Sequence, residues 1–300
     1  MREQRINGRN FWWAAGLGLA ADQMAGVMHR QFGMSHEPET ETFINPDSNR
    51  TIIVAGGMAN DGIALARKIT PNYLSSLGSV IGVRYAETNI EAEPLVAAIE
   101  EAIKTNGLEG NRFDAYLNSA GGIFMAEPLR RLAELQRHIG KVVMDSSPHD
   151  AGDVRWPLGK LIDVRFDLLK HSRTMAYFAR LASNQVIPPA GVKDTGIPLE
   201  HAEDDRDAIV NADTIVIGVQ AAKIRQGVPD GLLYDGVADE FVYLRCMGRD
   251  TLVKVDRATR GWGQSVRPLT TVVDPYRPAD SHAIGGSYPR GLAEVLRGTL

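Results

Sequence analysis

Short apolar runs recur along the chain, each bounded by polar, glycine or proline residues, and each has the length of a strand. They are continuous rather than alternating, which is typical of strands covered on both faces. The predicted strands span Thr51–Ala55, Val80–Tyr85, Asp114–Leu117, Val142–Asp145, Phe241–Met247 and Leu269–Val273. The segment Thr214–Gln220 is also apolar, but its periodicity does not decide between a strand and the start of a helix.

Helical patterns lie between these runs. The strongest is Glu91–Lys104, where Leu95, Ile99 and Ile103 recur at helical spacing. Further helices are predicted at Asp61–Ile69, Leu129–His138 and Ser287–Leu300. Strands and helices therefore alternate at short intervals. This alternation predicts an α/β fold, with a mostly parallel central sheet covered by helices on both faces.

Two segments interrupt the alternation. Residues 34–50 are polar and rich in turn-forming residues, which indicates a linker. Residues 152–212 combine helical stretches with a segment rich in proline and glycine, which indicates an inserted helical cap. We therefore expect an N-terminal helical segment and linker over 1–50, a core made of 51–151 and 206–300, and a cap insertion over 152–205.

The composition narrows the classes of partner. Of the 300 residues, 44% are hydrophobic and 23% are charged, as in an ordinary globular protein. The net charge is -4, and lysines and arginines form no block, so we do not expect nucleic acid as a partner. Cys246 is the single cysteine of the sequence, which excludes a disulfide framework within the chain and a cysteine-based metal cluster.

The N-terminal segment allows more than one interpretation. Three arginines precede an apolar run over Phe11–Ala21, which is shorter than the about 20 residues that cross a bilayer. One interpretation is an amphipathic helix, packed on the domain or in contact with a membrane surface through residues 9–30. The other is a cleaved signal peptide. We expect a cytoplasmic protein, with membrane association and export as the alternatives.

A candidate nucleophile follows the third predicted strand. The segment Leu117-Asn118-Ser119-Ala120-Gly121 has a serine at a sharp turn from strand to helix, where its hydroxyl would be exposed beside backbone N–H groups. Such a turn needs small residues two positions from the serine. Gly121 meets this need and Leu117 does not. On this motif alone, a serine that only caps a helix is an equal alternative.

Several other segments, in their order, resemble the α/β-hydrolase family. VAGGMANDG (Val54–Gly62) looks like the loop that leads into the family's oxyanion hole, and DAYLNSAGGIFMAE (Asp114–Glu127) looks like its nucleophile strand and turn. YLRCMGRDTLVKVDRA (Tyr243–Ala258) is similar to the strand and turn that deliver the acid, and DSHA (Asp280–Ala283) to the loop that delivers the histidine. VIGVRY and KVVMDSSP resemble two further strands, and the order Ser, Asp, His is that of the family.

The resemblance implies a serine hydrolase that cleaves a carboxylic ester, a thioester or a lipid ester. It implies Ser119 as nucleophile, His282 as general base and acid, and Asp250 as the residue that orients the imidazole. The N–H groups of Ala120, and of Met58 or Gly57, would hold the oxyanion. Asp145 is a reserve for the acid, because some members of the family take it from this earlier strand. Neither a metal nor an organic cofactor is implied.

Other interpretations stay open. Asp250 could simply begin a turn, because aspartate is common in turns. His282 could lie in a surface loop, and His149 and His171 would then be the alternative histidines. An inactive α/β-hydrolase scaffold is one alternative, because Leu117 departs from the family's small residue. An NAD(P)-dependent short-chain dehydrogenase is another, but Asn60 stands where its glycine motif needs glycine, and Tyr177 lacks a lysine four positions later.

Overall fold

The computed structural model describes residues 34–58, 61–155, 214–229, 234–250, 252–277 and 289–300, together with Asp22, Met24, Met28, Gly159, Ile162, Gly231 and His282. The N-terminal run and nearly all of the expected cap lie outside these residues. The cap prediction over 152–205 and the predicted membrane contact through 9–30 therefore stay predictions. None of the helices that the structure describes is both long enough and apolar enough to span a membrane.

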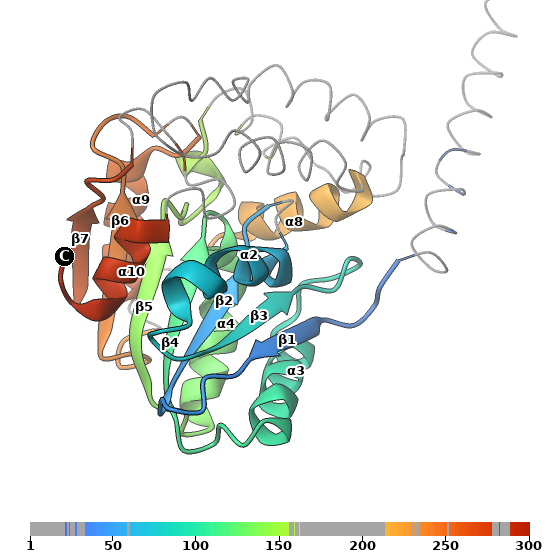
Figure 1. Ribbon diagram of the computed structural model, residues 1–300. Helices are drawn as coiled ribbons and strands as arrows, with labels where there is room; N and C mark the ends of the chain where they lie inside the picture. The colour runs from blue at the N-terminus through green and yellow to red at the C-terminus, as the bar shows by residue number, and fades with distance from the viewer. Residues whose placement is uncertain are drawn as a thin grey trace, which may run out of the picture.

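The described residues form one seven-stranded sheet (Figure 1) with the strand order β1-β3-β2-β4-β5-β6-β7. The strands are β1 (Glu39–Phe43), β2 (Arg50–Ala55), β3 (Ser79–Arg84), β4 (Arg112–Asn118), β5 (Ile139–Asp145), β6 (Glu240–Arg245) and β7 (Leu269–Val273). β1 pairs antiparallel with β3, and the other neighbouring pairs are parallel. The predicted mostly parallel sheet is therefore confirmed.

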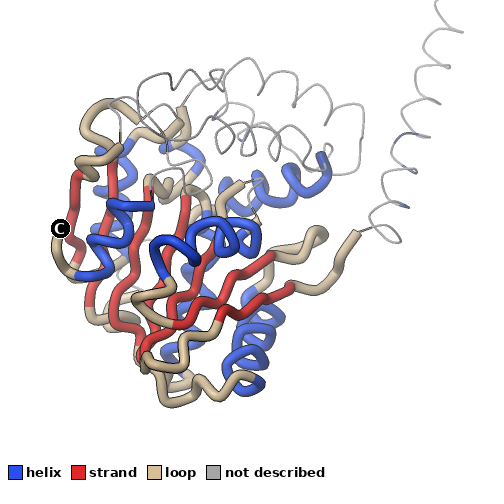
Figure 2. The backbone as a smooth tube through the Cα atoms, viewed as in Figure 1, coloured by secondary structure: helices blue, strands red, loops and turns tan. Residues whose placement is uncertain are grey.

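Helices cover both faces of the sheet, as Figure 2 shows. On one face lie α2 (Gly62–Ile69), the π-helical turn η1 (Thr70–Leu74) and α10 (Pro289–Arg297). On the other lie α3 (Ala92–Thr105), α4 (Gly121–Glu134), α8 (Thr214–Gln226) and α9 (Val255–Ser265). Alternate residues of the central strands point into the two resulting cores, which explains why those strands read as continuous apolar runs.

The predicted linker over 34–50 is wrong at Glu39–Phe43, which forms β1. This strand pairs with β3 at the edge of the sheet, with Glu39 opposite Arg84 and Phe43 opposite Val80. None of its residues is buried, so it has no apolar run that would mark it in the sequence. The sheet therefore begins before the expected core boundary at residue 51.

Two helices also differ from expectation. The helix predicted at Leu129–His138 is α4, which begins at Gly121 and ends at Glu134. Its first turn contains two glycines and its interior contains Pro128, residues that weaken a helical signal in the sequence. The ambiguous segment at Thr214 is helical as far as Gln226.

The direction in which strands are added to the sheet reverses between β2 and β4. From β2 the chain moves outward to β3 and then returns across β2 to β4. The helix after β2 packs on one face and the helix after β4 on the opposite face. The segments that leave these two strands therefore diverge, and ligands of open α/β sheets bind at such a switch point. Gly56 and Ser119 each follow one of the two strands.

Candidate active site

Ser119 occupies a strained turn between β4 and α4. Its φ is 49°, a left-handed conformation that is uncommon for a residue other than glycine. The turn is fixed by the Ser119 N–H, which donates to the Asp145 carbonyl at the end of the neighbouring strand at 2.9 Å. The serine therefore stands at the carboxyl edge of the sheet, directly before the first turn of a helix.

Close backbone approach explains the glycines around this turn. A Cβ on Gly121 would lie 2.8 Å from the Gly56 carbonyl oxygen, and a Cβ on Gly57 would lie 2.7 Å from the Ser119 Cβ. The loop after β2 and the serine turn are thus in direct contact. Leu117 does not crowd this contact, because it is buried in the core beside α4 and pairs in register with Ala55 and Met144.

The structure brings Ser119, His282 and Asp250 together. The His282 Nε2 lies 2.9 Å from the Ser119 Oγ, and its Nδ1 lies 2.9 Å and 3.0 Å from the two Asp250 carboxylate oxygens. Asp250 and His282 follow β6 and β7 in the chain and are both buried. Because an ionised carboxylate can only accept a hydrogen bond, the His282 Nδ1–H donates to Asp250, which leaves the Nε2 lone pair to accept from the serine hydroxyl.

Asp250 is held as a carboxylate in a fixed orientation. Its Oδ1 accepts the backbone N–H groups of Leu252 at 2.8 Å and Val253 at 2.7 Å, and its own carbonyl accepts the Arg155 Nε at 2.7 Å. Burial alone would raise the pKa of Asp250, but the His282 imidazole and these N–H donors outweigh it, so the pKa lies below its ordinary value. The carboxylate is therefore ionised at neutral pH, opposite the imidazole.

The candidate oxyanion residues border the same space. The Ala120 N–H lies at the start of α4, and a Cβ on Gly57 would lie 3.0 Å from that nitrogen. Among the described residues, the N–H groups of Ala120 and Met58 find no hydrogen-bond acceptor. The Tyr85 hydroxyl donates to the Gly56 carbonyl at 3.0 Å and so steadies the loop that carries Met58. The loop after β2 and the start of α4 thus meet at the serine turn.

Asp145, the reserve acid, does not contact His282. Its carboxylate pairs with the buried Arg277 and accepts the Tyr116 hydroxyl at 3.0 Å. His149 lies elsewhere as well, with its Nε2 2.9 Å from the Ser265 Oγ. His171 lies outside the described residues. Of the candidate acids and histidines considered from the sequence, only His282 and, through it, Asp250 are linked by their side chains to the Ser119 hydroxyl in the part of the chain that the structure describes.

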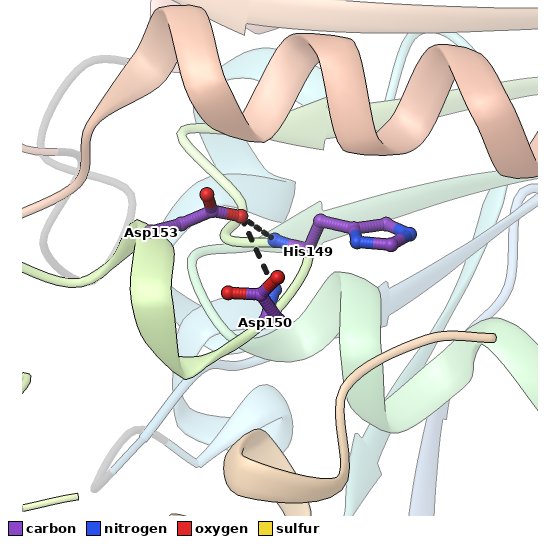
Figure 3. Close-up of side chains that lie close together, drawn as sticks. All are labelled: His149, Asp150 and Asp153. Carbon is purple, nitrogen blue, oxygen red and sulfur yellow. Dashed lines mark hydrogen bonds between the residues drawn. The ribbon is translucent and has the colours of Figure 1, made fainter. Parts of the chain in front are cut away.

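One group of residues resembles a cation site. The potential ligand atoms of His149, Asp150 and Asp153 all lie within 4.8 Å of one another. Figure 3 shows that the Asp153 carboxylate accepts the backbone N–H groups of His149 and Asp150, which caps the short helix η2 (Ala151–Asp153). The Arg257 guanidinium pairs with both carboxylates. Because an arginine already supplies the positive charge, these contacts account for the cluster without a metal ion.

Sequence patterns do not identify two residues of the site region. Tyr85 is predicted only as part of a strand, and Arg277 belongs to none of the motifs. No local pattern marks either of them, because their partners, Gly56 and Asp145, are 29 and 132 positions away. The sequence offers one indication for Arg277: it is a charged residue between a predicted strand, Leu269–Val273, and the segment that contains His282.

Comparison with known proteins gives structural matches only. No protein-family profile matches the chain, and no curated protein matches it in sequence. An esterase from Exiguobacterium antarcticum matches with a TM-score of 0.62 at 14% identity, over 88% of this chain and 97% of the esterase. A hydrolase from Oleispira antarctica matches with a TM-score of 0.61 at 13% identity, over 86% and 93% of the two chains.

A thermophilic esterase from Thermogutta terrifontis matches with a TM-score of 0.59 at 13% identity, over 87% of this chain and 92% of the esterase. At such identities the likeness concerns the fold, and the chemistry has to be argued from the residues of this chain.

Proposed function

Because the chain has the α/β-hydrolase fold, we propose that it is a serine hydrolase that cleaves carboxylic esters through an acyl-enzyme on Ser119. The observation that carries this proposal is the continuous hydrogen-bonded path from the Ser119 Oγ through the His282 imidazole to the Asp250 carboxylate, with contacts of 2.9 Å at each end of the ring. The path joins residues from three separate parts of the chain.

The first half of the reaction forms the acyl-enzyme. A serine hydroxyl is a weak nucleophile, so a base must take its proton as it attacks the ester carbonyl. The His282 Nε2 accepts that proton, and the imidazolium that results is stabilised by the ionised Asp250 on its other side. His282 then gives the proton to the departing alkoxide, which leaves as an alcohol.

The negative charge of the tetrahedral intermediate needs donors that are already in place. The Ala120 N–H and the N–H of Met58 or Gly57 border the space beside Ser119, and the N-terminus of α4 adds a favourable dipole. Removing one donor of this kind costs about 100- to 1000-fold in turnover in enzymes of this type. Water, activated by His282, then attacks the acyl group and regenerates the serine. These steps require neither a metal nor an organic cofactor.

The ester class is the part of the proposal that the site itself fixes least. Esters, thioesters and lipid esters share the same tetrahedral chemistry, and the expected cap, which would contact the acyl chain, lies outside the described residues. Ester substrates are favoured because two of the matched structures are named as esterases. The substrate is therefore proposed at the level of the bond that is cleaved.

The test is hydrolysis of a series of p-nitrophenyl esters with acyl chains from two to ten carbons. The proposal expects release of p-nitrophenol by the wild-type protein and its loss in the Ser119→Ala variant, with circular dichroism showing that both proteins are folded. Equal rates in the two proteins would show that Ser119 is not the nucleophile. No turnover of any ester, thioester or lipid ester by the folded wild type would favour the inactive scaffold instead.

A further inference from the structure

A buried charged network lies beside the candidate triad and takes no part in the steps above. Arg277 is fully buried, with 0% of its surface exposed, and Asp145 is 2% exposed. The Arg277 guanidinium donates to the Asp145 carboxylate and, at 2.8 Å, to the Ser146 Oγ. Both partners stand at the carboxyl end of β5, next to the serine turn. Arg277 therefore reaches from the turn after β7, past β6, to the carboxyl end of β5.

Asp145 links this arginine to the nucleophile. Its backbone carbonyl accepts the Ser119 N–H at 2.9 Å, while its carboxylate holds Arg277 and the Tyr116 hydroxyl. Burial and the nearby carboxylate keep the pKa of Tyr116 well above its ordinary value, so the hydroxyl stays protonated and donates. Asp145 thus contacts the backbone of the serine turn through its carbonyl and Arg277 through its carboxylate.

Arg277 is also close in sequence to the histidine. It stands five positions before His282, a distance of at most about 18 Å along an extended chain. The turn that carries it is held by further contacts, among them an ion pair of 3.8 Å between Arg277 and Asp274. The Asp274 carboxylate accepts the Tyr276 N–H at 2.9 Å, and the Tyr276 hydroxyl donates to Glu294 of α10 at 2.7 Å. We call the stretch of chain from Arg277 to His282 the histidine arm. It is held at its first residue, Arg277.

Stability alone does not explain a charged pair in this place. Desolvation offsets much of the attraction between buried charges, and apolar residues of similar volume often stabilise a protein as well or better. An apolar pair, however, lacks the directional hydrogen bonds that fix the orientation of a side chain. The planar guanidinium bonds to a carboxylate and a hydroxyl at once, which fixes Arg277 in orientation as well as in distance.

We propose that Arg277 is a positioning residue, which sets the place of His282 relative to Ser119 by fastening the histidine arm to Asp145. This inference rests on the proposed hydrolase function, and it adds a residue that acts on the reaction through another. Asp145 then has a role different from that of a reserve acid: it is the common anchor of the serine turn and the histidine arm.

The test compares Arg277→Met and Arg277→Lys with a matched control. Arg50 also pairs with a buried aspartate, Asp114, but at the opposite end of the sheet from Ser119. Arg50→Met therefore removes a similar ion pair without touching the histidine arm. For each variant the measurements are kcat and KM for the best p-nitrophenyl ester, and hydrogen–deuterium exchange of the peptide that contains His282.

The proposal expects kcat to fall about 10- to 100-fold in Arg277→Met, since a displacement near 1 Å costs about 100-fold, with KM little changed. Lysine keeps the charge but lacks the planar fork, so Arg277→Lys should recover part of kcat. Exchange in the His282 peptide should rise in Arg277→Met and stay unchanged in Arg50→Met, which should also keep the wild-type kcat.

An active wild type whose folded Arg277→Met and Arg277→Lys variants keep the full kcat would overturn the positioning role alone. The positioning role is also overturned if Arg50→Met lowers kcat as much as Arg277→Met, because the effect would then be one of general stability. If Arg277→Met does not fold, Arg277→Lys decides, and full activity in it would contradict the proposal. A wild type with no turnover would instead overturn the proposed function, and the positioning role with it.

Discussion

Replacing Gly57 by alanine tests the contact between the loop after β2 and the serine turn. The added Cβ would lie 2.7 Å from the Ser119 Cβ, 2.9 Å from the Asn118 oxygen and 3.0 Å from the Ala120 nitrogen. Ordinary contact begins at 3.4 Å, so the shortest of these distances must lengthen by about 0.7 Å. All three atoms belong to the turn itself, two of them to its backbone, and a change of side-chain rotamer cannot relieve the overlap.

Two consequences follow for the Gly57→Ala variant. Overpacking of this kind costs about 1–3 kcal/mol, so the free energy of unfolding should fall by that amount. The displacement also moves Ser119 away from the candidate oxyanion donor on the loop, the N–H of Met58 or Gly57, and since about 1 Å costs about 100-fold, kcat should fall about 10- to 100-fold. Urea unfolding and p-nitrophenyl ester hydrolysis measure the two quantities.

Gly110→Ala is the matched control, because a Cβ at Gly110 meets no atom within 4 Å. It should leave both stability and kcat close to the wild-type values. If Gly57→Ala is as stable and as active as Gly110→Ala, the loop and the serine turn are not in contact, and the assignment of Met58 or Gly57 as an oxyanion donor loses its basis.

Three further outcomes are expected. Asp250→Asn should lower kcat by about 10⁴-fold with little change in KM, as the loss of the triad acid does elsewhere; retention of more than a tenth of kcat would contradict its role. The pKa of Asp250 is lower in the folded protein than in the unfolded chain, where it is about 3.9. Its ionised carboxylate therefore stabilises the fold fully above the unfolded pKa, and this stabilisation is lost as the pH falls through the folded pKa. The difference in unfolding free energy between wild type and Asp250→Asn should thus shrink below about pH 4. Ile99→Ala empties a fully buried position of α3 and should cost about 2–5 kcal/mol while the kcat of the folded fraction is unchanged.

The sequence carries most of the information for the central fold. The strands β2 to β6 are marked by apolar runs, because most of their residues are buried on both faces of the sheet. β7 lies at the edge of the sheet with none of its residues buried, and its β-branched residues mark it instead. β1 has no such mark, since its side chains are partly exposed and its place is decided by pairing with β3. The early start of α4 is not predictable for a related reason: its two glycines serve close tertiary contacts, Gly121 with the loop after β2 and Gly122 with Ser147 and Trp262.

The residues of the candidate site that belong to recognisable motifs could be predicted from the sequence. The residues that are defined only by their contacts in the folded protein could not. Ser119, Asp250 and His282 stand in motifs that resemble those of a known family and in its order, which made them the expected triad, with Asp145, His149 and His171 as alternatives. The mismatch at Leu117 could not be weighed without the fold, which places this side chain in the core and assigns the close contacts to Gly57 and Gly121. Arg277 and Asp145, which pair with each other, lie 132 positions apart in the chain, so no local pattern in the sequence indicates their contact.

The most direct test of the central claim is labelling with a fluorophosphonate probe, followed by intact-mass and peptide mass spectrometry. The account predicts one adduct per protein molecule on Ser119, its absence in Ser119→Ala, and much slower formation in Asp250→Asn. No adduct on the folded wild type, or an adduct on a different residue, would contradict the assignment of Ser119 as an activated nucleophile.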